Sequence, residues 1–301
     1  MLVNRIKKKN MVLSATGILA VFLTLVWCMV LAEKNKNHEV SMFSWNYELE
    51  DKENFWENEK TLKEFNVTRV YQLMSADYIQ GQKMQDYMEN LSGADVEVVC
   101  LTGDKSWLYD GLEEFRGIVD ALAEYNQQAE EPYKIRNIAL DVEGHTLDEW
   151  QDEPKKIFRQ YIQLMKEARE YANERDLAVI QVIPTFLDEV DSGLFEAFLL
   201  DCCDELSVMN YNKKNAATAA RTEYDLCGKY HIPIESVFEM MPVDEEQGVT
   251  ENITYYYEGH EGLKKAIKEI KSAYGPDMGI GLHHFTVIHE GNCVSEPKKA
   301  L

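Results

Sequence analysis

The sequence predicts a (β/α)₈ barrel preceded by one N-terminal transmembrane helix, and three observations lead to that fold class. Eight short apolar runs alternate with longer amphipathic stretches between residues 40 and 285, which is the pattern of strands and helices in βαβ units. Their combined length is close to the roughly 250 residues that such a barrel usually takes. A long uncharged apolar run, residues 11–32, precedes them.

The apolar run at residues 11–32 is long enough to cross a bilayer. As one helix it would span roughly 33 Å, against a hydrocarbon core of roughly 30 Å. The basic cluster within residues 1–10 favours a cytoplasmic tail there and an extracytoplasmic location for residues 33–301. The alternative is a cleaved signal peptide and a secreted protein, since Val30 and Ala32 are small enough for a cleavage site. We expect an uncleaved signal anchor in the cell membrane, because the run exceeds the roughly 7–15 residues of a signal h-region.

Composition excludes several classes of partner and cofactor. The net charge is −22, and such a surface repels nucleic acid and anionic lipid. The cysteines outside the apolar run have no CxxC spacing, and the sequence contains no HExxH. We therefore expect neither a zinc site nor another metal or cofactor.

The periodicity of apolar residues gives the order of elements. The expected strands are residues 40–45, 67–74, 96–102, 136–143, 178–185, 205–211, 234–241 and 278–285. Helical patterns, with apolar residues at three- and four-residue steps, occupy residues 56–65, 112–126, 154–174 and 257–274. A doubly wound open sheet is the alternative, but no Gly-rich phosphate loop follows the first strand, where such folds often bind nucleotides.

The fourth expected strand, residues 136–143, ends on two carboxylates. Its apolar residues occupy one face, while Asn137, Ala139, Asp141 and Glu143 share the other. Active sites of (β/α)₈ enzymes lie at the C-terminal ends of the strands, so the acid pair would stand at the inner rim of the barrel. There a second carboxylate raises the pKa of a general acid. The competing interpretation is that a strand end carries carboxylates because it meets water.

Two later strands direct side chains to the same rim. By the same alternation, the sixth expected strand places Met209 and Tyr211 inward, and the eighth places His283 and Phe285 inward. The sequence therefore predicts one mouth that is lined from three strands.

The D-x-E at Asp141 to Glu143 and the M-x-Y at Met209 to Tyr211 resemble the motifs of glycoside hydrolase family 18, the chitinase-like barrels. The resemblance implies that Glu143 is the general acid and that Asp141 orients the N-acetyl group of the substrate. It also implies that the carbonyl oxygen of that group is the nucleophile and that Tyr211 steadies it. The implied ligand is an N-acetylated glycan such as peptidoglycan, a chitin fragment or an N-glycan.

The sequence departs from the family's longer motifs, D-G-x-D-x-D-x-E and M-x-Y-D. Asn137 and Ala139 stand where the family has aspartates, and Asn212 stands where it has the last Asp. The final strand offers His283 and lacks the family's usual Trp. A catalytically inactive carbohydrate-binding barrel is therefore a second hypothesis, and an interaction scaffold at the cell envelope is a third.

Glu239 offers an alternative catalytic layout. It lies near the end of the seventh expected strand, and with Glu143 it resembles the carboxylate pair of double-displacement retaining glycosidases, about 5–5.5 Å apart. The alternation of residues does not decide which face Glu239 occupies. We expect it to line the mouth.

Loop residues complete the expected substrate-binding set. Trp107 is expected to stack on a sugar and Asp104 to bond a hydroxyl group, although a Trp in such a place more often anchors its own loop. Trp45 follows the first strand and is expected to act similarly. The expected substrate-binding residues are thus Trp45, Asp104, Trp107, Met209, Asn212, Glu239 and His283.

Overall fold

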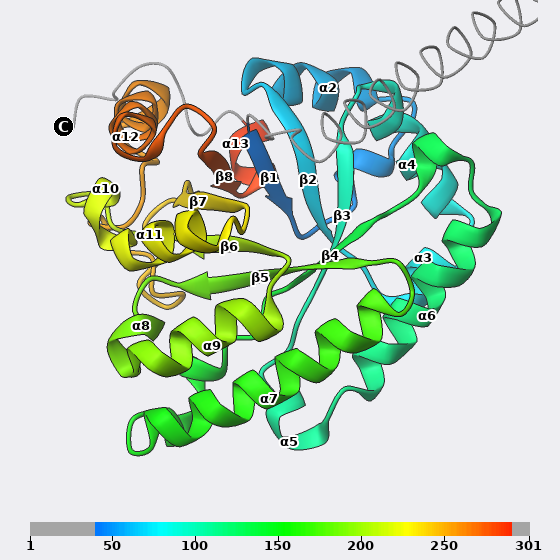
Figure 1. Ribbon diagram of the computed structural model, residues 1–301. Helices are drawn as coiled ribbons and strands as arrows, with labels where there is room; N and C mark the ends of the chain where they lie inside the picture. Colours follow the sequence, from blue (N-terminus) through cyan, green and yellow to red (C-terminus); the bar gives the residue numbers. More distant parts are fainter. Residues whose placement is uncertain (1–39, 291–301) are drawn as a thin grey trace, which may run out of the picture. The chain divides into compact units, whose positions relative to one another are not determined.

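The computed structural model describes residues 40–290, which form a closed barrel of parallel strands with helices around it (Figure 1). The strands follow one another around the barrel in chain order, and β8 pairs with β1 to close it. The strands are β1 (Val40–Ser44), β2 (Val67–Leu73), β3 (Glu97–Thr102), β4 (Asn137–Leu140), β5 (Ala178–Pro184), β6 (Glu205–Met209), β7 (Ile234–Glu239) and β8 (Gly279–His283). The (β/α)₈ barrel predicted from the sequence is confirmed.

Helices connect the strands on the outside of the barrel. The α-helices are α2 (Phe55–Glu64), α3 (Ala76–Ile79), α4 (Lys83–Gly93), α5 (Trp107–Asp110), α6 (Glu113–Gln128), α7 (Pro154–Asn173), α8 (Leu187–Val190), α9 (Ser192–Cys202), α10 (Ala216–Ala219), α11 (Arg221–Tyr230), α12 (Gly259–Tyr274) and α13 (Phe285–His289). Short 3₁₀ helices are η1 (Glu48–Glu50), η2 (Glu131–Tyr133), η3 (Gly144–Thr146) and η4 (Asp148–Trp150). The four helical patterns expected from the sequence correspond to α2, α6, α7 and α12.

The expected basic tail and signal anchor, residues 1–10 and 11–32, lie outside the described residues. Within residues 40–290, no helix combines the length and the apolar character that crossing a bilayer requires.

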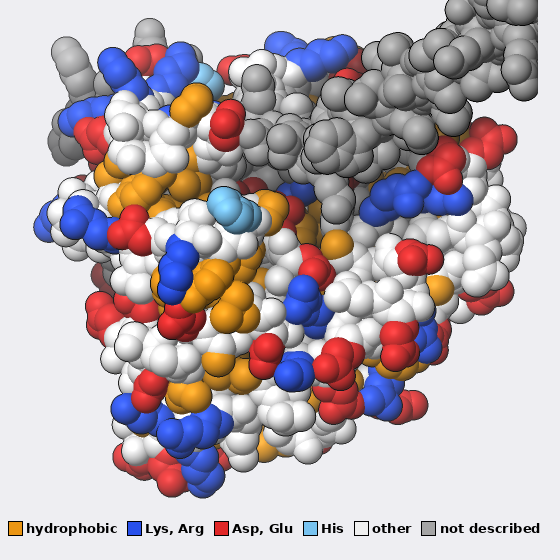
Figure 2. Space-filling model, in the orientation of Figure 1, with side chains coloured by type: hydrophobic (Ala, Val, Ile, Leu, Met, Phe, Trp, Pro, Cys, Tyr) orange, Lys and Arg blue, Asp and Glu red, His pale blue; other side chains and the backbone are white. Residues whose placement is uncertain are grey.

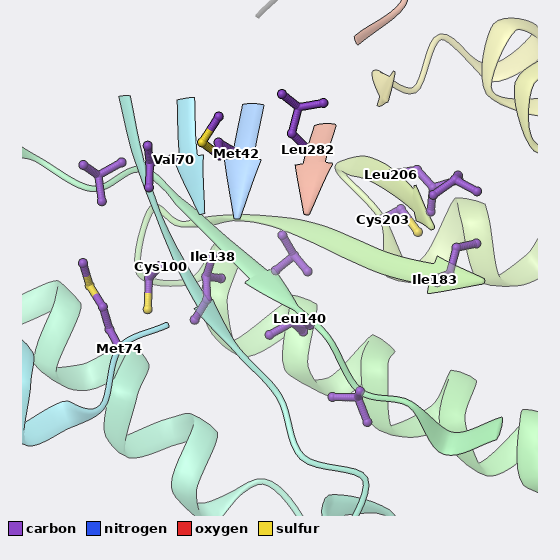
Figure 3. Packing of buried hydrophobic residues seen from close by; sticks show 14 of the residues in the cluster. Met42, Val70, Met74, Cys100, Ile138, Leu140, Ile183, Cys203, Leu206 and Leu282 are labelled. Atoms are coloured by element: carbon purple, nitrogen blue, oxygen red, sulfur yellow. The ribbon is translucent and has the colours of Figure 1, made fainter. Parts of the chain in front are cut away.

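The outward faces of the strands pack against the helices. Cys100, Ile138 and Leu140 are fully buried between the barrel and its outer layer (Figure 3). They are the apolar residues that the alternation along each strand directs outward. This outer core fixes which side chains remain to face the barrel axis.

A separate apolar cluster fills the barrel interior, and we call it the barrel plug. It consists of Phe43, Tyr71, Val99, Leu101, Ala139, Ile180, Val182 and Val237, all buried. Phe43 and Tyr71 stack with ring centroids 4.5 Å apart. Trp45, Met209 and Tyr211 pack on the plug and are partly buried. The plug therefore forms the floor of the opening at the C-terminal ends of the strands.

Seven of the eight strands end one to three residues before the expected end, and the ends of β4 and β8 bear on predictions for Glu143 and Phe285. β4 ends at Leu140 and η3 begins at Gly144, so Glu143 belongs to a loop and not to the strand. β8 ends at His283 and α13 begins at Phe285. The prediction that Phe285 faces inward is wrong, because the alternation of a strand does not continue into a helix, and this ring lies in the outer core.

The exposed surface carries charges of both signs. On the face shown in Figure 2, acidic and basic side chains are interspersed. Several form exposed ion pairs, such as Arg116 with Glu167. Pairs of this kind contribute at most about 1 kcal/mol each.

A buried charge network lies at the N-terminal end of the barrel interior. Arg69 is 4% exposed; it pairs with Glu205 and with Glu97, and it donates to the Tyr71 hydroxyl at 3.3 Å. Glu235 lies nearby and accepts hydrogen bonds from two serine hydroxyl groups, each at 2.6 Å. Burial, followed by the negative charge of Glu205, raises the pKa of Glu235, while Arg69 supplies the compensating positive charge.

Replacing Arg69 with alanine is expected to lower the free energy of unfolding by about 3–5 kcal/mol, because buried carboxylates lose their cation. Arg116→Ala, which removes an exposed pair, serves as the matched control and should cost at most about 1 kcal/mol. Urea unfolding of the parent and both variants measures the two differences. Equal, small losses would contradict the importance of the buried network.

Candidate active site

The C-terminal ends of four strands bring predicted site residues together at one mouth. Asp141 follows β4, Tyr211 follows β6, Glu239 ends β7 and His283 ends β8. The Tyr211 and His283 rings have centroids 6.3 Å apart. The pKa of Tyr211 is raised well above its usual value by burial and then by the negative charges of Glu239, Asp141 and Glu143. Tyr211 therefore keeps its proton and offers the mouth a hydroxyl donor.

Asp141 is partly buried at the mouth, and one oxygen of its carboxyl group is fully buried. Its backbone N–H donates to the Thr102 carbonyl at 2.9 Å, which extends the β3–β4 pairing by one residue. Gly103, at φ +154°, lies so close that a Cβ there would meet the Asp141 carbonyl oxygen at 2.2 Å; only glycine fits this approach. The Oδ1 atom of Asp141 is buried without a hydrogen-bond partner. Burial, followed by the charge of Glu143, raises the pKa of Asp141 to about 7.

Glu143 lies closer to solvent than Asp141. Its side chain is 44% exposed, and its backbone carbonyl is held by the Thr146 N–H at 2.9 Å and the Thr146 hydroxyl at 2.8 Å. The two carboxyl groups predicted as a pair thus differ in environment, because Oδ1 of Asp141 is buried and the Glu143 side chain is reached by water.

His145 is a member of this site to which the sequence analysis assigned no role. Its Nε2 atom lies 3.7 Å from Oε1 of Glu143. Burial lowers the pKa of His145, and the charge of Glu143 raises it in part. The positive charge of Lys105 lowers the pKa further. His145 follows Glu143 by two residues, and from this spacing the sequence could have indicated that the two side chains lie close together.

A small hollow opens beside Glu143 and His145. Its volume is about 10 Å³, close to the minimum for one water molecule. The lining is largely apolar and includes Trp150, Tyr161 and Met209. Met209 therefore contributes to the surface next to the acid pair, on the side of β5.

Three side chains link β1, β7 and β8 through hydrogen bonds. The Trp45 indole Nε1–H donates to Nε2 of His283 at 2.9 Å. The other ring nitrogen of His283, Nδ1, lies 3.0 Å and 3.1 Å from the carboxylate oxygens of Glu239. Glu239 Oε1 also accepts the Met241 backbone N–H at 2.8 Å. Because Nε2 accepts from the indole, Nδ1 must carry the proton that is donated to Glu239.

Other predicted binding residues serve their own loops. Trp107 is 2% exposed in the outer core and donates to Glu114 at 3.0 Å. Asp104 is exposed and its Oδ1 accepts the Ser106 N–H at 2.7 Å, while Asn212 Oδ1 accepts the Asn215 N–H at 3.1 Å. The structure does not bring Trp107 to the mouth, in agreement with the alternative that this side chain anchors its loop.

Within residues 40–290, no three His, Cys, Asp or Glu side chains are grouped as a metal site would require. The cysteines of that range are free and buried.

Asp141→Asn is expected to change how stability depends on pH. Below about pH 4 the Asp141 carboxyl is protonated in the folded and the unfolded chain. Between pH 4 and pH 7 the unfolded chain releases this proton at the usual pKa of 3.8, whereas the folded protein keeps it until about 7, so stability falls as pH rises. Asparagine cannot ionise, so the variant should gain about 2–4 kcal/mol relative to the parent between pH 4 and pH 8.

Urea unfolding of both proteins across that pH range measures the difference. A difference that stays constant with pH would show that Asp141 ionises at the same pH in the folded and unfolded chains.

Comparison with known proteins identifies solved structures with a similar fold. No protein-family model matches the chain, and no curated protein matches it. Solved structures do match. A GH18 chitinase from Pseudoalteromonas aurantia has a TM-score of 0.50 and 11% identity, over 85% of this chain and 97% of that chain.

Two further structures have the same architecture. The spore cortex-lytic enzyme of Bacillus megaterium has a TM-score of 0.50 and 9% identity, over 84% of this chain and 73% of that chain. A Bacteroides thetaiotaomicron protein named as an alpha-L-fucosidase has a TM-score of 0.56 and 10% identity, over 83% of this chain and 87% of that chain. The chain therefore has the barrel fold of GH18 chitinases and of other glycosidases. At these identities, the likeness concerns the fold.

Proposed function

We propose that this protein is a membrane-anchored, extracytoplasmic glycoside hydrolase that acts on an N-acetylated glycan. Glu143 is the general acid, Asp141 orients the acetamido group, and Tyr211 holds the carbonyl of that group. The observation that carries the proposal is the position of Asp141. Its carboxyl group has one buried, unpartnered oxygen and a pKa raised to about 7, at the end of a barrel where glycosidases bind their substrates.

The chemistry follows from the different environments of the two carboxyl groups. Oδ1 of Asp141 is buried, so it can engage the substrate amide with little competition from water. Glu143 lies at the solvent edge, where the leaving part of a glycan would depart. The acetamido carbonyl oxygen attacks the anomeric carbon, the glycosidic C–O bond breaks, and the Glu143 proton passes to the leaving oxygen. Water then attacks the anomeric carbon to release the product and returns a proton to Glu143.

A carbohydrate-binding barrel without catalysis is the second candidate, and two observations favour it. Asn212, which replaces the family's last Asp, uses its side-chain oxygen for its own turn. Ala139, which replaces an aspartate below Asp141, belongs to the apolar plug. A barrel of this kind would retain the aromatic and hydroxyl contacts and would tolerate loss of Glu143.

The layout that pairs Glu143 with Glu239 as nucleophile has less support. The Glu239 side chain is 4% exposed, and its carboxylate oxygens accept hydrogen bonds from His283 and from the Met241 N–H. A carboxylate that must attack an anomeric carbon needs a free and accessible lone pair.

Glu143→Gln is expected to lower the rate of glycan cleavage by about 10²- to 10⁴-fold, because the amide cannot donate the proton that the leaving oxygen needs. The full-length parent and variant would be incubated with peptidoglycan, chitooligosaccharides and N-glycans. Mass spectrometry reads the released reducing ends, and calorimetry reads binding.

The two candidates give different results in this experiment. Cleavage by the parent that is lost in the variant supports the hydrolase and identifies the linkage. Equal binding by both proteins without cleavage supports the sugar-binding barrel, and the absence of binding and cleavage would contradict both.

Membrane anchoring through residues 11–32 predicts that the full-length chain stays in the membrane pellet after an alkaline carbonate wash, because an apolar helix of that length is held by the hydrocarbon core. N-terminal sequencing should then recover the uncleaved start of the chain. A soluble protein that begins shortly after Ala32 would contradict the anchor and support a cleaved signal peptide.

A further inference from the structure

Glu239, His283 and Trp45 form a continuous hydrogen-bonded chain across the mouth. The first link joins the Glu239 carboxylate to Nδ1 of His283 at 3.0 Å, and the second joins Nε2 of the same ring to the Trp45 indole N–H at 2.9 Å. The two rings meet edge to face, with centroids 5.9 Å apart and planes at 77°. The three residues come from β7, β8 and the loop after β1, so this chain joins the two strands flanking β8.

Glu239 determines which atoms donate and which accept along this series of hydrogen bonds. A carboxylate can only accept, so the imidazole must present its proton there and leave Nε2 as an acceptor. Glu239 itself is held by the Met241 N–H at 2.8 Å. The backbone carbonyl of Glu239 accepts the Tyr255 N–H at 2.9 Å, which ties this strand end to the following loop. The Glu239 end of this hydrogen-bonded series is therefore held more rigidly than its Trp45 end.

We propose that Glu239 and His283 are positioning residues for Trp45, whose indole they hold at the mouth as a platform for one pyranose ring of an N-acetylated glycan. This inference rests on the proposed function. Trp45 is partly buried against the barrel plug, and the link to His283 restricts rotation of its ring. An aromatic ring that is fixed before binding loses little conformational entropy when a ligand stacks on it.

The same arrangement gives Glu239 a role that does not require attack on the substrate. Its oxygens are occupied by the imidazole and by the backbone, and its negative charge selects the ring tautomer that Trp45 needs. Glutamine at this position retains an oxygen that can accept from Nδ1–H, whereas alanine retains none. The pair of variants therefore separates positioning from nucleophilic catalysis.

The test measures the tautomer of His283 directly. The full-length chain, which contains seven histidines, would be labelled with ¹⁵N in those rings, and His283→Asn would assign the relevant signals by difference. The parent is expected to show one neutral form with the proton on Nδ1. Glu239→Gln should keep that form, and Glu239→Ala should give a mixture of both tautomers.

Binding of chitotetraose, measured by calorimetry in a Glu143→Gln background, tests the platform. Glu239→Ala and Trp45→Phe are each expected to weaken binding about tenfold, and Glu239→Gln by no more than about twofold. Glu114→Ala is the matched control, because Glu114 also accepts a tryptophan N–H, that of Trp107, but outside the mouth. This control should leave chitotetraose affinity unchanged.

The outcomes separate this inference from the proposed function. A proton on Nε2 in the parent, or full chitotetraose affinity in Glu239→Ala, would overturn the positioning role while glycan binding by the parent leaves the proposed function standing. A fixed Nδ1–H tautomer without any chitotetraose binding would overturn the platform. If the parent also bound and cleaved no glycan of the wider panel, the proposed function would fail with it.

Discussion

Dehydration of the barrel interior is the constraint on which the candidate site depends. The plug fills the barrel with apolar side chains, so the buried Asp141 carboxyl lies above material that cannot solvate an ion. Ala139 lies two residues before Asp141 on the same inward face and belongs to that plug. A charged carboxylate in such a place is costly, and the group reduces the cost by keeping its proton up to about pH 7. The apolar packing of the barrel thus determines the protonation state of the mouth.

The two ends of the barrel interior accommodate buried acids in different ways. At the N-terminal end, Arg69 lies among glutamates and supplies the opposite charge that makes their burial tolerable. At the mouth, burial has the largest effect on the pKa of Asp141 and raises it, and the charge of Glu143 adds to that rise. A carboxyl group is therefore compensated by an ion pair at the N-terminal end of the barrel, whereas the Asp141 carboxyl at the mouth keeps its proton up to about pH 7.

The sequence predicted the barrel because strand alternation and helix periodicity are local properties. The same alternation placed Asp141 on the inner face, and its prediction for Phe285 failed because a helix begins there. The face of Glu239 was undecided, since the residues of its strand are apolar and polar on both sides. Its hydrogen bonds to His283 depend on pairing between strands, which no local pattern reports. The burial of Trp107 likewise depends on how α5 packs in the outer core.

The departures from the family motif acquire a physical meaning in this context. An aspartate in place of Ala139 would put a second carboxyl below Asp141, and the pair would share charge and protons. With alanine there, the pKa of Asp141 is raised first by burial and then by the charge of Glu143. A mouth without aspartates at positions 137 and 139 can therefore still hold a protonated carboxyl group. The raised pKa then depends first on burial above the barrel plug and second on the charge of Glu143.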